Sequence, residues 1–348
     1  MEHTTLLLKE QYEAFKAENP KTRIRDAAKQ LAVSEAELVA TGDQNITLKP
    51  EFQDILKEIG SLGYVMALTR NDHAVHERKG VYTKATFHGH VGLVANPDID
   101  LRLFMTAWHF GFAVQEGDRR SLQFFDQDGE AVHKIYLTEQ SDTKAYDALV
   151  EKYKAEIQGQ APQTTPIDKT ISETPDSEID VAGFQAAWLA LKDTHAFFGM
   201  LQKFGVARHQ SMRLAPEGHA TQLSVASLKR IIEGASERDL DIMVFIGSRG
   251  CIQIHTGKTK KLLQAGPWFN VLDPEFNMHL REDAVADVWL VKKPTEDGIV
   301  TSLEAFDAGG NLIVQFFGKR KPRIPEREDW REVVADYAVA ALKQPQDL

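Results

Sequence analysis

The sequence predicts an α+β protein built as a tandem structural duplication, each half having a large antiparallel β-sheet with flanking helices. Two segments resemble each other: residues 121–137 read SLQFFDQDGEAVHKIYL, and residues 302–318 read SLEAFDAGGNLIVQFFG. Strand-like segments follow one another directly instead of alternating with helices, which favours antiparallel pairing over a doubly wound sheet. A polar segment with three prolines separates the two copies. We therefore expect an N-terminal repeat at 1–158, a linker at 159–180 and a C-terminal repeat at 181–348.

Each copy of the repeat contains a hairpin signal, a strand followed by a glycine-containing turn and a second strand. Asp128-Gly129 occupies the first turn and Gly309-Gly310 the second. Such dipeptides between apolar runs are typical of hairpins. Further matches keep the same order along the chain; they pair 31–38 with 204–211, 66–69 with 243–246, and 96–103 with 273–280. This agreement over most of each half indicates duplication.

Helical periodicity closes each half, and a polar connector lies between the halves. Residues 145–157 and 330–342 both have apolar residues at helical spacing. The connector, 159–180, contains few apolar residues, so we expect it to be exposed.

Composition limits the classes of function. The chain has 348 residues and a formal net charge of -10, which disfavours a protein that coats nucleic acid or an anionic membrane. Cys251 is its one cysteine, so an internal disulfide and a cysteine-based metal cluster are excluded. We find neither a signal peptide nor an apolar run long enough to span a bilayer, and we expect a cytoplasmic protein without membrane insertion.

One histidine is predicted to lie at the start of a helix. In the segment 193–204, DTHAFFGMLQKF, apolar residues at helical spacing follow His195, and Asp193 or Thr194 can cap the free N–H groups. A neutral imidazole there is a candidate axial ligand for haem iron or another transition metal. The alternative is a histidine that only assists the helix start.

The two copies differ at polar positions. Thr22 stands where the second copy has His195, Glu35 where it has Arg208, and Lys134 where it has Gln315. We therefore expect one site per chain, built from unlike parts of the two halves, rather than two equal sites.

Cations are available for the carboxylates that haem would bring. Arg208, Lys293 and Arg320 lie in the second half, and each of them could equally be a solvated surface cation. Arg102 lies in the alternating segment 99–104. It cannot ligate a metal, but it could hydrogen-bond to a ligand on iron or to a propionate.

Several segments of the chain, and their order along it, resemble the HemS/HmuS/ChuS family of bacterial cytoplasmic haem-utilisation proteins, also called haemin-degrading factors. The resemblance covers nearly the whole chain and rests on four segments: DTHAFF at 193–198, VFIGSRGCIQI at 244–254, KKPTEDG at 292–298 and IDLRLF at 99–104.

The resemblance implies a haem held in a cleft of the C-terminal half and closed by part of the N-terminal half. It implies that His195 is the proximal iron ligand and Arg102 the distal arginine. The remaining residues that it assigns to the cofactor are the rim cations Arg208, Lys293 and Arg320 and the pocket-lining Phe245 and Gln315. Many members have Tyr where this chain has Phe317, so a phenol donor at the haem edge is lost. His73 lies where some members have a histidine used in haem handling, and His209 is the next candidate ligand after His195.

Two functions agree with this resemblance. One is oxidative haem degradation with release of iron; the sequence has no flavin or nicotinamide fingerprint, so the electrons would come from an external reductase or other donor. The other is a carrier that delivers haem to a separate haem oxygenase. A third hypothesis, DNA binding, comes from residues 23–38, which read like a helix-turn-helix, although Glu35 and Glu37 at the second helix would repel phosphate.

Overall fold

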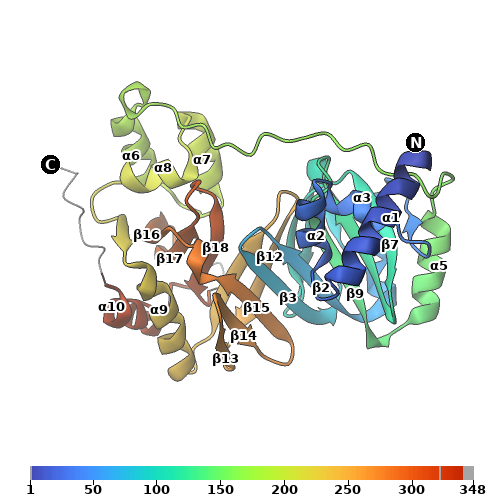
Figure 1. Cartoon of the computed structure of the whole chain (residues 1–348). Coiled ribbons are helices and arrows are strands. Elements are labelled where there is room, and N and C mark those ends of the chain that lie inside the picture. Colours follow the sequence, from blue (N-terminus) through green and yellow to red (C-terminus); the bar gives the residue numbers. More distant parts are fainter. Residues whose placement is uncertain (1, 321–322, 340–348) are drawn as a thin grey trace. The chain divides into compact units, whose positions relative to one another are not determined.

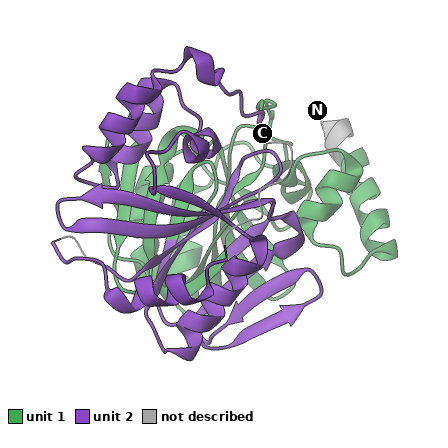
Figure 2. Cartoon of the chain, turned by 90° about the vertical axis from the view of Figure 1, so that its left-hand side faces the viewer, with its two compact units in different colours: residues 1–70, 76–168, 247–253 green, residues 71–75, 169–246, 254–348 purple. Residues whose placement is uncertain are grey.

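The computed structural model describes residues 2–320 and 323–339, and they divide into two compact units. Unit 1 comprises residues 1–70, 76–168 and 247–253, and unit 2 comprises residues 71–75, 169–246 and 254–348 (Figure 2). Each unit therefore takes one short segment from the other half of the sequence. Among the described residues, we find no helix with the length and apolar character needed to cross a membrane.

Unit 1 is an antiparallel sheet with helices on its two faces. Its helices are α1 (Glu2–Glu18), α2 (Ile24–Leu31), α3 (Glu35–Ala40), α4 (Phe52–Glu58) and α5 (Thr143–Tyr153), with short 3-10 turns at Ile59–Leu62 and Met105–Ala107. Its strands are β1 (Ile46–Thr47), β2 (Gly63–Arg70), β3 (Ala74–Val81), β4 (Thr86–His88), β5 (Val91–Ala95), β6 (Asp100–Phe104), β7 (Phe110–Glu116), β8 (Arg119–Phe125) and β9 (Ala131–Ser141). The strand order is β1-β7-β8-β9-β2-β3, and β4, β5 and β6 pair with one another as an antiparallel ribbon.

Unit 2 repeats this arrangement element by element. Its helices are α6 (Val181–Leu189), α7 (Ala196–Phe204), α8 (Arg208–Arg213), α9 (Val225–Glu237) and α10 (Glu328–Tyr337), with 3-10 turns at Asp176–Glu178 and Glu282–Ala284. Its strands are β10 (Ala220–Leu223), β11 (Ile242–Gly247), β12 (Cys251–Gly257), β13 (Leu262–Ala265), β14 (Trp268–Leu272), β15 (Phe276–Arg281), β16 (Asp287–Thr295), β17 (Gly298–Phe306) and β18 (Leu312–Gly318). The order β10-β16-β17-β18-β11-β12 matches that of unit 1, and β13–β15 form the equivalent ribbon. The predicted α+β fold with a tandem duplication is confirmed.

The predicted hairpins are present in both units. β8 pairs with β9 and β17 pairs with β18, each across a tight turn. The turns contain Gly129 and Gly310 at φ 79° and 77°, in the left-handed region that glycine adopts without a Cβ clash. The predicted closing helices are α5 and α10, and residues 340–342 of the second lie outside the described residues.

Two apolar layers cover the sheet of unit 2. One face packs against α9 and α10 through residues such as Ile231, Val314 and Trp330. The other face packs against α6, α7 and α8, with Trp188 and Phe197 in contact with Val291 and Phe306. In Figure 1 these three short helices form a separate cluster above β16–β18. The predicted histidine helix therefore packs on one defined face of this sheet.

The linker is mostly exposed, as the sequence predicts, but it is hydrogen-bonded near both ends. Thr165 N donates to Gln127 O in unit 1 at 2.6 Å. In unit 2, Gln210 Nε2 donates to Thr174 O, also at 2.6 Å, and Arg213 pairs with Asp176. The polar composition of the linker predicts that it is exposed, but it does not predict these hydrogen bonds and this ion pair.

The segment that reads like a helix-turn-helix forms two helices, α2 and α3, that pack on the sheet of unit 1. Ser34 caps α3, and Glu37 completes a capping box. Glu35 is buried and bonded to Lys134 of β9 at 2.5 Å, so it is directed into the protein and not towards solvent.

Candidate haem-binding site

His195 is the N-cap residue of α7, one position before the helix begins. Its side chain is 79% exposed, and its Nδ1 lies 2.7 Å from Asp193 Oδ1. The same carboxylate accepts the backbone N–H of His195 at 2.9 Å. That backbone bond is the main cause of a lowered pKa of Asp193, and the charge of Arg320 contributes.

These contacts select one tautomer of the imidazole. Because the ionised Asp193 can only accept, Nδ1 of His195 must carry a hydrogen, so the neutral ring has its lone pair on Nε2. Metal-binding histidines commonly donate their other ring N–H to a carboxylate in this way. The neutral ring can thus offer Nε2 to a metal, and the role of His195 as an axial ligand stays a prediction.

The helix behind His195 is firmly anchored. Phe197, Met200 and Leu201 are buried, as the helical spacing predicts. The ring of Phe197 meets that of Trp188 edge-on, with 4.8 Å between centroids. Phe198, in contrast, is 63% exposed. The buried side of α7 therefore holds the helix in place, while His195 and the ring of Phe198 are exposed to solvent.

Two of the predicted rim cations share one buried carboxylate. Arg208, the first residue of α8, donates from Nε to Glu304 Oε2 at 2.9 Å. Lys293 of β16 donates to Glu304 Oε1 at 2.5 Å. Glu304 in β17 and Lys293 are both buried, whereas the Arg208 side chain is 28% exposed. Although burial acts to raise it, the charges of Arg208 and Lys293 hold the pKa of Glu304 well below its ordinary value.

The predicted pocket-lining residues lie on the same face of the sheet. Phe245 of β11 is directly opposite Gln315 of β18, and Gln315 is opposite Glu304. Opposed residues in an antiparallel pair share a face. The Phe317 and Phe245 rings lie 5.0 Å apart between centroids. Unit 2 therefore groups these side chains on the face that α7 and α8 cover.

Arg102 lies in unit 1, on β6. Leu101 and Leu103 are buried, and the intervening Arg102 is on the other face of the strand with a 33% exposed side chain. Its guanidinium pairs with Asp100. It is opposite Leu93 of β5, which is also exposed. The alternation predicted for this strand is confirmed, and the distal role stays a prediction.

The other two candidate histidines are less exposed than His195. His209 Nε2 lies 3.1 Å from Asp287, and its ring packs on Phe306. His73 Nε2 lies 3.6 Å from Asp307. Their side chains are about one-quarter exposed, so a flat ligand would reach neither as readily as His195. No cluster of three or more His, Cys, Asp or Glu suited to a metal ion occurs in the described ranges.

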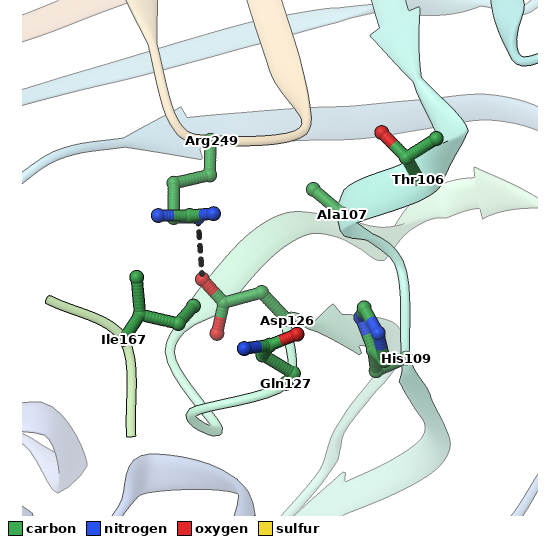
Figure 3. A pocket seen from close by; sticks show the side chains of 7 residues that line it. All are labelled: Thr106, Ala107, His109, Asp126, Gln127, Ile167 and Arg249. Atoms are coloured by element: carbon green, nitrogen blue, oxygen red, sulfur yellow. Dashed lines mark ion pairs between the residues drawn. The ribbon is translucent and has the colours of Figure 1, made fainter. Parts of the chain in front are cut away.

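A small cavity lies elsewhere, in unit 1, and none of the predicted site residues is among its lining (Figure 3). Its volume is about 180 Å³, and its lining consists of Thr106, Ala107, His109, Asp126, Gln127, Ile167 and Arg249. Asp126 faces Arg249 at 3.7 Å, and burial raises the pKa of Asp126 to about 7. Sites for drug-sized ligands usually have roughly 300–1,000 Å³ and mainly apolar walls. This polar cavity is thus too small for a tetrapyrrole.

Sequence reasoning missed Glu304. A lone acidic residue between Leu303 and Ala305 resembles a solvent-facing strand position. Its counterpart in the first repeat is the uncharged Gln123, which is also fully buried. Comparison of the two repeats could have pointed to it. Glu304 is charged where the other copy has a neutral residue, and a charge at a position that is buried in both copies needs a partner close by.

Comparisons with known proteins agree with these observations. The sequence model described as "Haemin-degrading HemS.ChuX domain" matches residues 32–153 and again residues 205–337. The chain is 38% identical to the hemin transport protein HmuS of Yersinia pestis over 335 residues, which covers 94% of this chain and 96% of that protein. HemS of Yersinia enterocolitica, another hemin transport protein, is also 38% identical, over 333 residues.

Solved structures resemble it over nearly the full length. Holo-PhuS, a heme-binding protein from Pseudomonas aeruginosa, superposes with a TM-score of 0.93 at 47% identity, covering 96% of this chain and 99% of that one. The Escherichia coli O157:H7 heme-degrading enzyme ChuS gives 0.89 at 33% identity, with the same coverage. By the two matched segments and these identities, the chain belongs to the haemin-degrading HemS family of haem-utilisation proteins.

Proposed function

We propose that the protein binds haem through His195 and serves haem utilisation. The observation that carries this is the hydrogen bond from His195 Nδ1–H to Asp193, which directs the lone pair of an exposed, rigidly mounted imidazole outwards. Haem-binding PhuS and the hemin transport proteins support the choice of ligand. An exposed histidine with Phe198 beside it suits a flat apolar ligand with one protein bond to its iron.

Titration of the full chain with haem tests this proposal. We expect a Soret band with saturable one-to-one binding. His195→Ala should bind more weakly and shift the band, because the proposed iron ligand is gone. His209→Ala is the matched control, since His209 already faces Asp287. An unchanged spectrum in His195→Ala, with loss in His209→Ala, would move the assignment to His209.

Oxidative degradation of the bound haem is the finer function that we infer. When bound, haem would supply the oxygen chemistry, and the chain would have to hold the ring and provide a hydrogen-bond donor near the reacting oxygen. Arg102 is our assignment for that donor, since guanidinium donates hydrogen bonds but cannot bind iron. The heme-degrading relative ChuS supports this function.

The alternative is a carrier that passes haem to a separate haem oxygenase, and incubation of the haem complex with a reductant distinguishes the two. Loss of the Soret band with iron release, unaffected by catalase, supports the enzyme. If catalase abolishes the loss, peroxide in solution is the cause and the carrier function is favoured. Arg102→Ala should slow a true enzymatic loss while His195 ligation, seen in the spectrum, persists.

A further inference from the structure

Glu304 accepts hydrogen bonds from three side chains. Its Oε1 accepts from Lys293 at 2.5 Å and from Ser302 at 3.1 Å. Its Oε2 accepts from Arg208 Nε at 2.9 Å, and it also lies 2.9 Å from a terminal nitrogen of the same guanidinium. The carboxylate is fully buried, so water does not compete for these bonds. Its position fixes both cations at once.

The arrangement leaves donors of Arg208 for another anion. Glu304 engages the Nε edge of the guanidinium, and the fork has five N–H donors in a fixed plane. The Arg208 side chain is partly exposed. One carboxylate against two cations also leaves a net positive charge in the cluster. The remaining N–H groups thus have the geometry and the charge to bind a carboxylate.

The same cluster contacts the helix that carries His195. Arg208 and Lys293 both lie over the ring of Phe197, at 5.6 Å and 4.3 Å from its centroid. Phe197 follows His195 by two residues in the first turn of α7. Both cations therefore pack directly against the helix that follows His195, through the ring of Phe197.

The first repeat builds a comparable helix-to-sheet contact with the charges exchanged, from the neighbouring strand of the sheet. There the first residue of α3 is the carboxylate Glu35, which pairs with Lys134 on the sheet at 2.5 Å. In unit 2 the helix supplies the cation Arg208, and the sheet supplies the carboxylate Glu304. Both pairs connect the helix to the sheet, but only the arrangement of unit 2 places a partly exposed cation against Phe197, in the helix that follows the candidate ligand histidine.

We propose that Glu304, which also pairs with the buried Lys293, is a positioning residue that holds the partly exposed Arg208 so that it binds a free carboxylate of the tetrapyrrole, making the site selective for the free acid over its esters. This inference rests on the proposed haem function. Glu304 itself does not touch the ligand. It sets the distance and direction of Arg208, the cation that does.

The test compares the affinities of the full chain for haem and for haem dimethyl ester. The wild type should prefer haem, since the ester has no carboxylate charge to pair with the guanidinium of Arg208. Glu304→Asp keeps the charge but withdraws the carboxylate by one methylene, so the cations shift. We expect the preference to fall by about tenfold, the scale of one lost charge-assisted hydrogen bond. The Soret band should keep its position, because His195 is unaltered.

Glu35→Asp is the matched control, with the same change at the charge-exchanged pair of unit 1. It should retain the full preference for haem. Two results would overturn the inference. In one, Glu304→Asp prefers haem over the ester as strongly as the wild type does. In the other, Glu35→Asp loses as much of this preference as Glu304→Asp. If Glu304→Asp does not fold, Arg208→Lys serves in its place. It keeps the charge without the planar fork, and a retained preference there would also overturn the inference.

The same data separate this inference from the proposed function. A wild-type chain that shows the His195-dependent Soret band but binds haem and ester equally contradicts only the positioning role. A chain whose haem spectrum is indifferent to His195→Ala contradicts the proposed function.

Discussion

At the scale of single residues, Asp193 is the most consequential neighbour of the candidate ligand. It accepts both the backbone N–H and the ring Nδ1–H of His195, and its lowered pKa keeps it ionised. The sequence predicts that Asp193 or Thr194 caps the helix start. The structure instead makes His195 the N-cap and gives Asp193 the added task of orienting the ring. The preference of aspartate for helix N-termini does not by itself predict that Asp193 also contacts the ring of His195.

Asp193→Asn should weaken haem binding by about tenfold, because a neutral amide no longer raises the basicity of the ligand imidazole. The asparagine oxygen can still accept the backbone N–H, so the helix should persist. Haem titration measures the effect. Asp180→Asn is the control, since Asp180 caps α6 in the same unit by bonding Gly183. Equal affinities in Asp193→Asn and the wild type would contradict an orienting role.

At the scale of elements, a buried hydrogen-bonded chain connects the strands of unit 1. His133 of β9 bonds through Nδ1 to Thr69 Oγ1 at 2.8 Å and through Nε2 to Tyr82 OH at 2.6 Å. Burial lowers the pKa of His133 to about 3. The equivalent position in the second repeat is Val314, so the fold does not require a histidine there.

This histidine should make the stability of unit 1 depend on pH. The unfolded chain takes up a proton on His133 below about pH 6.5, whereas the folded chain stays neutral until about pH 3. The free energy of unfolding should therefore fall as pH decreases between those values, by about 1.4 kcal/mol per pH unit from this group. Urea unfolding at pH 7, 6 and 5 would measure the slope. His133→Val should remove that component, and an unchanged slope would show that His133 does not contribute.

Local pattern predicted the hairpins and the apolar stripe of α7, because turn chemistry and side-chain periodicity are encoded over a few residues. Gly129, Gly310 and the segment 197–204 are examples. The cluster around Glu304 could not be predicted in this way, since its partners lie 11 and 96 residues away in sequence. Long-range pairing depends on strand register, which composition does not specify.

At the scale of the whole molecule, each unit includes a short segment from the other half of the sequence. In unit 2, Asn71 Nδ2 donates to Ile313 O at 2.8 Å, and Arg281 N donates to His73 O at 2.9 Å. In unit 1, Ser248 Oγ donates to Val132 O at 2.8 Å. The predicted boundaries assign both segments to the halves that carry them in sequence, because sequence periodicity follows the chain and not its contacts.

A fragment comprising residues 169–348 should therefore be less stable than unit 2 in the full chain. It lacks Asn71–Val75 and the hydrogen bonds that they make. We expect a lower and broader thermal unfolding transition, monitored by circular dichroism. A second fragment with residues 71–75 joined through a flexible linker should recover part of the loss. A sharp transition in the first fragment at the temperature of the full chain would show that the segment is dispensable.

The central claim is that His195 binds the iron of haem, and His195→Gly with added imidazole tests it most directly. The side chain is exposed and mounted on a firm helix, so its removal should leave space that free imidazole can reach. We predict that the variant loses the wild-type Soret band and that imidazole restores it, with no such effect in His209→Gly. A wild-type spectrum in His195→Gly without imidazole would contradict the claim.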